Sequence, residues 1–168
     1  MSKMTYREVL TAVALLSALP LDVKVKEKEG EYTRSLDSKL TGRVLSLLAN
    51  LNLHAKTYAE LEMQTRRALV SDEQVKRFME YQSKAEKASE DFVRDSEIEA
   101  EIMACNSRIN AAMAEINAQE VEVKPLLFSA EEYAQITEHT QGAEIVVNGQ
   151  SVPRLHWLAD FGALLVEK

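Results

Sequence analysis

Apolar positions recur every three or four residues along two long stretches of the chain. The first stretch carries Leu40, Val44, Leu47, Leu51, His54, Tyr58 and Leu61, in which His54 occupies one position of the series. The second carries Ile98, Ile102, Cys105, Ile109, Ala112 and Ile116. Alternating steps of four and three form a heptad stripe, which covers one side of a helix and pairs with a matching stripe on another helix. The pattern predicts two long helices, over about 32–70 and 96–117, that pack antiparallel.

Capping motifs predict where four helices begin. In a capping box, a serine or threonine before the helix and a Glu or Gln three residues later each accept a hydrogen bond from the other's backbone amide. Four pairs have this spacing: Thr5 with Glu8, Ser71 with Gln74, Ser96 with Glu99, and Ser129 with Glu132. Pro20 is expected to end the first helix, because it lacks an amide donor. A last helix is expected to begin at Pro153 and to end at Gly162.

Alternating apolar and polar residues predict short strands. Residues 120–124 alternate strictly, and residues 144–147 and 150–152 flank Asn148-Gly149, which predicts a β-hairpin because both turn residues tolerate positive φ. Residues 21–26 alternate as well, and the sequence leaves open whether they form a short strand or an extended entry into the next helix. Gly30 weakens any helix that runs through it, so the second helix is expected to begin near Tyr32.

These elements together predict a mainly α protein. Residues 1–119 are expected to form a long antiparallel helical hairpin or bundle with heptad seams. Residues 120–168 are expected to form a small α+β element with a β-hairpin, packed on the bundle in one domain overall. A length of 168 residues fits one domain, and 46% hydrophobic with 28% charged residues is typical of a chain that folds.

The N-terminal segment and the single cysteine bear on where the protein resides. The apolar run from Val9 to Leu21 is too short to cross a bilayer, so no membrane span is expected. Glu8 interrupts the segment that superficially resembles a signal peptide, and no small-residue cleavage site follows. Cys105 is the only cysteine, which excludes an intrachain disulfide and fits a buried seam position. We expect a cytoplasmic protein.

The two halves of the chain differ in charge. Residues 1–84 hold 14 Lys and Arg against 11 Asp and Glu, a net +3, whereas residues 85–168 hold 6 against 16, a net −10. The acidic residues concentrate at Glu86, Glu90, Asp91, Asp95, Glu97, Glu99 and Glu101. This run either imitates nucleic-acid phosphates or forms a solvated helix face opposite basic residues of the second helix, and we favour the second interpretation. Direct nucleic-acid binding is disfavoured, because no basic cluster is interleaved with aromatic residues.

No set of residues in the sequence predicts catalysis. His54, His139 and His156 fall on three separate elements without acidic or cysteine partners at ligand spacing, so no metal site is expected. The sequence has no nucleophile elbow, no phosphate-binding glycine loop and no Glu-x-x-His unit of a di-iron bundle. We expect neither a cofactor nor an enzymatic activity.

Several short segments, in their order along the chain, resemble one family. The first helix ends in Leu-Pro and is followed by Val-Lys-Val at 23–25. A long helical middle then leads to Asn-Ala-Gln-Glu-Val-Glu-Val at 117–123 and Leu-Phe-Ser-Ala-Glu-Glu at 127–132. This order over residues 8–136 resembles small helical proteins encoded in bacteriophage genomes, a family that lacks the Asn-Gly hairpin and the segment around Trp157. The resemblance implies a viral or mobile-element origin, hence a bacterial host, and supplies no catalytic residues.

Two surfaces are candidates for binding a protein partner. The C-terminal tail carries Arg154 and Trp157, residue types that dominate interface hot spots. Trp157 and Phe161 lie four residues apart, and they fit a small satellite core as well, which is the interpretation we favour. The acidic helix at 86–101 is the other surface, with contacts expected from Glu90, Asp91, Asp95 and Glu97.

The predicted function is that of a non-enzymatic protein–protein interaction factor, encoded by a phage, that binds and inhibits a host defence or nucleic-acid enzyme. The alternative is a structural or assembly component of a phage particle. The second helix is nearly twice as long as its expected partner, so part of its stripe, either 36–44 or 58–61, is expected to stay uncovered. Such a seam predicts a homo-oligomer in addition to a host or viral protein partner.

Overall fold

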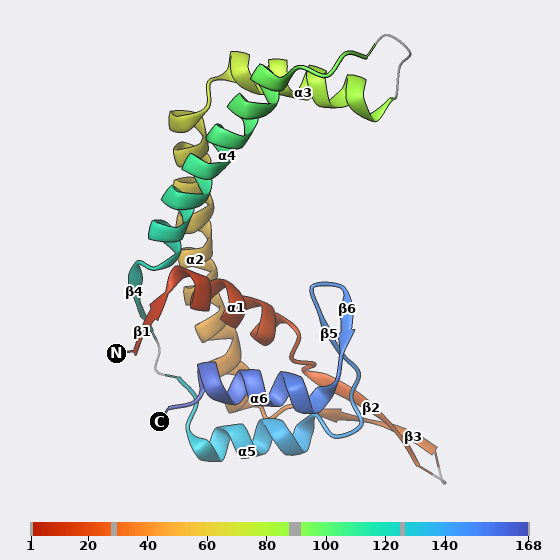
Figure 1. The fold of residues 1–168 in the computed structure, drawn as a ribbon. Helices are drawn as coiled ribbons and strands as arrows, with labels where there is room; N and C mark the ends of the chain where they lie inside the picture. The colour runs from red at the N-terminus through yellow and green to blue at the C-terminus, as the bar shows by residue number, and fades with distance from the viewer. Residues whose placement is uncertain (1, 28–29, 88–91, 125–126, 168) are drawn as a thin grey trace. The chain divides into compact units, whose positions relative to one another are not determined.

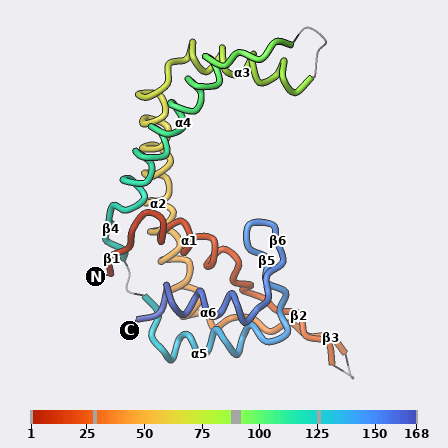
Figure 2. Tube along the Cα trace, viewed as in Figure 1, coloured from red at the N-terminus to blue at the C-terminus, as the bar shows by residue number. Residues whose placement is uncertain are grey.

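The computed structural model describes residues 2–27, 30–87, 92–124 and 127–167. In chain order the elements are β1 (Ser2–Thr5), α1 (Tyr6–Ser17), β2 (Asp22–Glu27), β3 (Gly30–Ser35), α2 (Ser38–Leu69), α3 (Asp72–Glu86), α4 (Ser96–Asn117), β4 (Glu120–Val123), α5 (Ala130–His139), β5 (Ile145–Val147), β6 (Gln150–Val152) and α6 (Arg154–Leu165). The structure is 65% helical with small antiparallel β-hairpins, which confirms the mainly α fold class (Figures 1 and 2). No described helix is both long and apolar enough to cross a bilayer.

The chain divides into two compact units. The terminal unit comprises residues 1–56 and 119–168, and the helical unit comprises residues 57–118. This division differs from the expected one into residues 1–119 and 120–168. The reason is that the two ends of the chain meet in one unit, where β1 pairs with β4 and α1 packs against α6.

A pair of strands joins the beginning of the terminal unit to its later part. β1 and β4 are antiparallel, with Ser2 opposite Val123 and Thr5 opposite Glu120. Thr5 also caps α1 with the expected capping box, in which its backbone amide donates to Glu8 Oε2 at 2.7 Å. The sequence predicted β4 but not β1, because β4 alternates apolar and polar residues, whereas β1 has Met4 as its one apolar residue and shows no such pattern.

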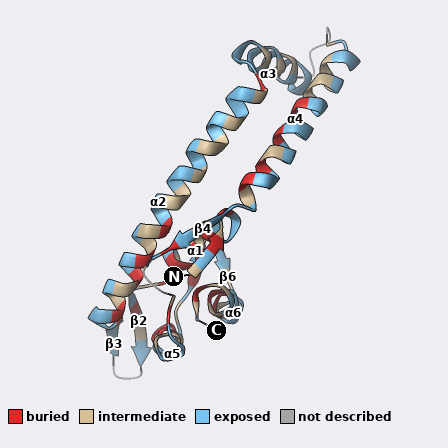
Figure 3. Ribbon diagram, turned by 90° about the vertical axis from the view of Figure 1, so that its left-hand side faces the viewer, coloured by how far each residue is buried: buried red, intermediate tan, exposed pale blue. Residues whose placement is uncertain are grey.

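The hydrophobic core of buried residues lies in the terminal unit (Figure 3). Its largest wholly buried side chains include Trp157, Phe128, Phe161, Leu16, Leu47 and Leu51. The ring of Phe161 stacks with those of Phe128 and Tyr133, at centroid distances of 5.6 and 6.2 Å. The first heptad stripe contributes Leu40, Val44, Leu47 and Leu51, which are buried as expected but in this core, whereas the buried residues of the second stripe belong to the helical unit.

The second helix begins later than expected, at Ser38 instead of near Tyr32. The preceding residues form β3, which pairs with β2 so that Val23 lies opposite Arg34. Residues 21–26, left open by the sequence, are therefore mostly strand. Gly30, the first residue of β3, has a φ of +150°, which is incompatible with a helix running through it. The Asp37 carboxylate accepts hydrogen bonds from the amides of Lys39 and Leu40, and this contact marks the start of α2.

The Asn148-Gly149 hairpin is confirmed, but the expected helix end at Gly162 is wrong. Asn148 and Gly149 have φ values of +50° and +80°, and they connect β5 to β6. Helix α6 continues through Gly162 to Leu165. A Cβ at Gly162 would lie 3.0 Å from the Tyr133 hydroxyl, which donates a hydrogen bond to the Leu158 carbonyl at 2.7 Å. Gly162 thus allows a close approach between α5 and α6.

The helical unit consists of the end of α2, with α3 and α4. Helix α4 returns antiparallel alongside the end of α2 (Figures 1 and 3). The second heptad stripe faces inward, because Cys105, Ile109 and Ile116 are buried. The cap of α4 is Asp95, one residue before the expected Ser96, and its carboxylate accepts from the amides of residues 97 and 98 at 3.0 and 3.1 Å.

Candidate functional site

A hollow of about 460 Å³ lies within the helical unit, between the end of α2, α3 and α4. Its apolar lining consists of Val70, Val75, Phe78, Met79, Ile102, Cys105 and Ile109, and we call this feature the apolar groove. Arg66, Arg67 and Asp72 also border it. The groove combines the second heptad stripe with one face of α3, on which Val75, Phe78 and Met79 follow the helical spacing of three and four.

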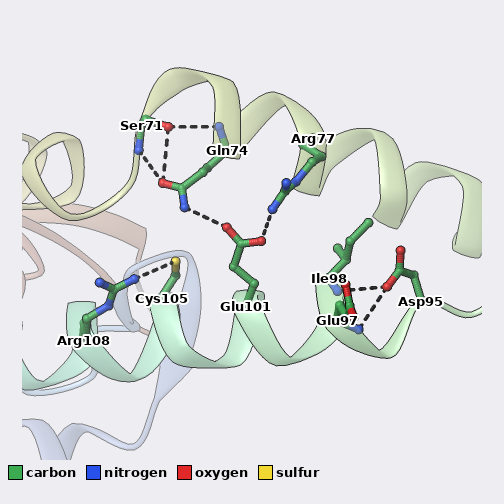
Figure 4. Close-up of polar contacts among 9 residues, drawn as sticks. All are labelled: Ser71, Gln74, Arg77, Asp95, Glu97, Ile98, Glu101, Cys105 and Arg108. Atoms are coloured by element: carbon green, nitrogen blue, oxygen red, sulfur yellow. Dashed lines mark hydrogen bonds and ion pairs between the residues drawn. The ribbon is translucent and has the colours of Figure 1, made fainter.

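Polar contacts hold the first half of α3 on α4 (Figure 4). Ser71 caps α3 in the expected box with Gln74. The side-chain amide of Gln74 donates to Glu101 Oε1 at 2.8 Å, and the Arg77 guanidinium pairs with the other oxygen of the same carboxylate. Two residues of α3 thus share one carboxylate on α4, which keeps the apolar face of α3 over the groove.

A second set of contacts fixes the other end of α3. The Tyr81 hydroxyl donates to Glu99 Oε1 at 2.9 Å and accepts from the backbone amide of Asp95 at 3.1 Å. Arg94 binds both oxygens of Glu99 at 2.8 and 2.9 Å. The hydrogen bond from Arg94, followed by that from Tyr81, lowers the pKa of Glu99, whereas burial raises the pKa of Tyr81. Glu99 is therefore held as the ionised acceptor that joins α3 to α4.

The apolar groove is open to solvent along α3. Met79 is 65% exposed and Val75 is 38% exposed, and α3, which is described in full, buries none of its residues. On the opposite wall Cys105 is buried, with its Sγ 3.3 Å from a guanidinium nitrogen of Arg108. A strongly amphipathic helix without a buried residue is typical of a surface that another molecule covers.

Of the acidic residues expected to bind a partner, Asp95 has a role within the helical unit itself. Asp95 caps α4, Glu97 is exposed in its first turn, and Glu90 and Asp91 lie outside the described residues. Glu99 and Glu101 bind Arg94 and Arg77, not the basic residues of the second helix. Two basic residues of α2 have other partners: Arg43 pairs with Glu132, and Arg66 pairs with Glu62. Arg34, expected on the same helix, lies on β3 and donates to the carbonyl of His139.

The two tail residues do not form an exposed surface. Trp157 is wholly buried in the main core, not in a separate satellite core, and its indole nitrogen donates to the Leu15 carbonyl at 3.1 Å. Arg154 donates to the Thr140 hydroxyl at 3.2 Å and to the Thr137 carbonyl. Trp157 and Arg154 belong to the terminal unit, whereas Asp95 and Glu97 belong to the helical unit.

A larger hollow, in the terminal unit, is lined mainly by polar residues, and several of them already bind other groups of the chain. It measures about 840 Å³ and is bordered by residues of β3, the start of α2, and α5. Arg34 donates to the carbonyls of His139 and Gln141, and Asp37 caps α2. Within the described ranges, no group of three or more His, Cys, Asp or Glu side chains could hold a metal ion.

Comparison with known proteins returns no match: no family model, curated protein or solved structure resembles the chain. The groove is therefore the feature from which function is inferred. Of the two stretches expected to stay uncovered, 36–44 is covered, since Leu36, Leu40 and Val44 are buried. In the other stretch, 58–61, Tyr58 and Leu61 are half-buried, and neither lines the groove. The spacing of Val75, Phe78 and Met79 already indicated an apolar helix face. The sequence alone did not show that this face stays exposed to solvent in the single chain.

Proposed function

We propose that the chain is a non-enzymatic protein–protein interaction factor, encoded by a phage and active in the cytoplasm of a bacterial host. The apolar groove of the helical unit carries this proposal. Its occupant is an amphipathic helix of another protein chain, host or viral, with apolar residues at positions i, i+4 and i+7. A host defence or nucleic-acid enzyme that uses such a helix for its own assembly would be inhibited when the groove binds it.

The walls of the groove favour a helix over a small molecule. Their apolar side chains come mainly from α3 and α4, where they repeat every three or four residues, and ridges of another helix fit such spacing. Met79 adds a flexible side chain that adapts to different apolar partners. Arg67 is exposed beside the groove and favours an occupant with acidic residues on its flank.

A synthetic helical peptide tests the proposal directly. The probe carries leucines at i, i+4 and i+7 with glutamates on the flank, and fluorescence anisotropy measures its binding to the full chain. Met79→Asp places a charge in the groove and is expected to weaken binding by about tenfold or more, which corresponds to about 1.4 kcal/mol.

Leu155→Asp is the matched control, because Leu155 is 72% exposed on α6 in the terminal unit. This variant is expected to bind the peptide like the unmodified chain. Equal binding by the Met79→Asp variant, or no binding by the unmodified chain, would remove the groove as the functional site. Turnover of a substrate by the purified chain would contradict the non-enzymatic proposal.

The second candidate function is a structural or assembly component of a phage particle. It is favoured by the helical unit, whose apolar face could be covered by lateral packing in a ring or shell. Mass spectrometry of purified particles separates the two functions. A particle component would be present in stoichiometric amounts, whereas an intracellular inhibitor would be absent.

A further inference from the structure

The helix that the apolar groove requires is present in the chain itself. Helix α3 carries Val75, Phe78 and Met79 on one face, and the acidic residues Glu73 and Glu80 lie on the opposite side of the helix. It is capped at its start by Ser71 and is held in place by Gln74 and Arg77, so it is formed before any partner binds. A preformed helix loses little conformational entropy on binding.

The same face of α3 both borders the hollow and projects out of it. Met79 is 65% exposed at the edge, while Cys105 on the opposite wall is 2% exposed. A surface with a projection beside a hollow can be self-complementary across a twofold axis. The projection of each copy then fits into the hollow of the other. Two copies related in this way bring α3 of each chain over the groove of the other.

The thin core of the helical unit indicates that such a cover stabilises it. Among the described residues, none of the largest wholly buried side chains lies in 57–118; all of them belong to the terminal unit. The buried residues in the described part of the helical unit are Val70, Cys105, Ile109, Met113 and Ile116. A unit of about sixty residues is marginal even with a full core, and units with less are commonly stabilised by association.

We propose that the apolar groove is a homodimer interface, in which Met79 of each chain enters the hollow beside Cys105 of the other. This inference rests on the proposed function, because it takes the groove to be a receptor for a helix. The inference also says what occupies the groove when no other partner is bound, namely a second copy of the chain. A host helix that binds the groove then competes with the second copy.

Light scattering coupled to gel filtration tests the oligomeric state. The unmodified chain and the Leu155→Asp control are expected to have the mass of a dimer, and Met79→Asp is expected to have the mass of a monomer. A monomeric unmodified chain at micromolar concentration, a dimeric Met79→Asp variant, or a monomeric Leu155→Asp control would each overturn the proposal.

A disulfide between two copies of the chain tests the contact itself. This test does not depend on whether the Met79→Asp variant folds. One chain carries Met79→Cys with Cys105→Ser, and the other, with a distinct tag, keeps only Cys105. After mixing and mild oxidation to the disulfide by oxidised glutathione, a product containing both tags is expected, because a disulfide requires Cβ atoms about 4 Å apart. Leu155→Cys with Cys105→Ser is the control and is expected to give none. Equal yields from the two cysteine positions would overturn the proposal.

The dimer and the proposed function can fail separately. A monomer that still binds the helical peptide in the groove removes the homodimer and leaves the proposed function. The opposite result is a dimer that depends on Met79 and in which the peptide does not displace the second copy. That result would support the homodimer and contradict the binding of another protein's helix as the function.

Discussion

Arg43 and Glu132 join α2 to α5 within the terminal unit. The guanidinium binds both oxygens of the carboxylate, at 3.0 and 3.1 Å, and both side chains are half-buried. Arg43 also donates to the Leu127 carbonyl and lies over the Phe128 ring, 5.7 Å from its centroid. The hydrogen bond from Arg43 lowers the pKa of Glu132, so the folded state favours the ionised carboxylate.

This pair predicts a pH-dependent contribution to stability. A carboxyl whose folded pKa is lowered stabilises the protein above the ordinary value of 4.5, and the contribution is lost as the pH falls through the folded pKa. Glu132→Gln keeps an oxygen for the capping box but loses the charge. We expect it to reduce the free energy of unfolding by about 1 kcal/mol at neutral pH and by less in acid.

Urea unfolding at neutral and at acidic pH measures this difference. Glu131→Gln is the control, because Glu131 is the exposed neighbour in the first turn of α5. A loss of stability on Glu132→Gln that stays constant down to acidic pH would show that the pair contributes through packing and not through charge.

At the scale of elements, local signals in the sequence were sufficient where the structure depends on near neighbours. The capping boxes at Thr5, Ser71 and Ser129 are all present, and so is the Asn148-Gly149 turn. Each depends on residues within a few positions of one another.

The elements that the sequence missed depend on distant partners. β1 is a strand only because β4 is beside it, and Gly162 permits contact with Tyr133 on another helix. The same applies to the site. The burial of Trp157 depends on α1, whose Leu15 carbonyl accepts its hydrogen bond, and the groove depends on α3 lying over α4. Hydrophobic spacing identifies an apolar face but not what covers it.

The start of α4 provides a prediction for a single element. Asp95 accepts hydrogen bonds from two amides of the first turn, whereas Ser96 is already inside the helix. Asp95→Ala is expected to cost about 1 kcal/mol of helix stability through the lost cap. Ser96→Ala is expected to change it by only a few tenths of a kcal/mol, since serine has a modest propensity inside helices.

Amide hydrogen exchange across α4 measures both variants, with α1 as an internal reference. Faster exchange in the first turn is expected for Asp95→Ala alone. An equal effect from Ser96→Ala would assign the cap to the residue that the sequence pattern indicated.

At the scale of the whole molecule, the two units differ in how they bury apolar side chains. The terminal unit contains the core around Trp157 and Phe161, to which both ends of the chain contribute. The helical unit is stabilised by the apolar seam between its helices and by hydrogen bonds from α3 to Glu99 and Glu101 of α4. Local opening requires less free energy where fewer apolar contacts must be broken. The helical unit is therefore expected to open without unfolding the terminal unit.

Hydrogen exchange at several protein concentrations tests this expectation together with the homodimer. Amides of α3 are expected to exchange faster than those of α6, and their protection is expected to rise with concentration because association stabilises only the folded groove. Met79→Asp should abolish the concentration dependence in α3 and leave α6 unchanged, since α6 belongs to the other unit. Protection in α3 that equals that in α6 and does not vary with concentration would mean that the helical unit is stable by itself. The exposed face of α3 would then need no second copy to cover it.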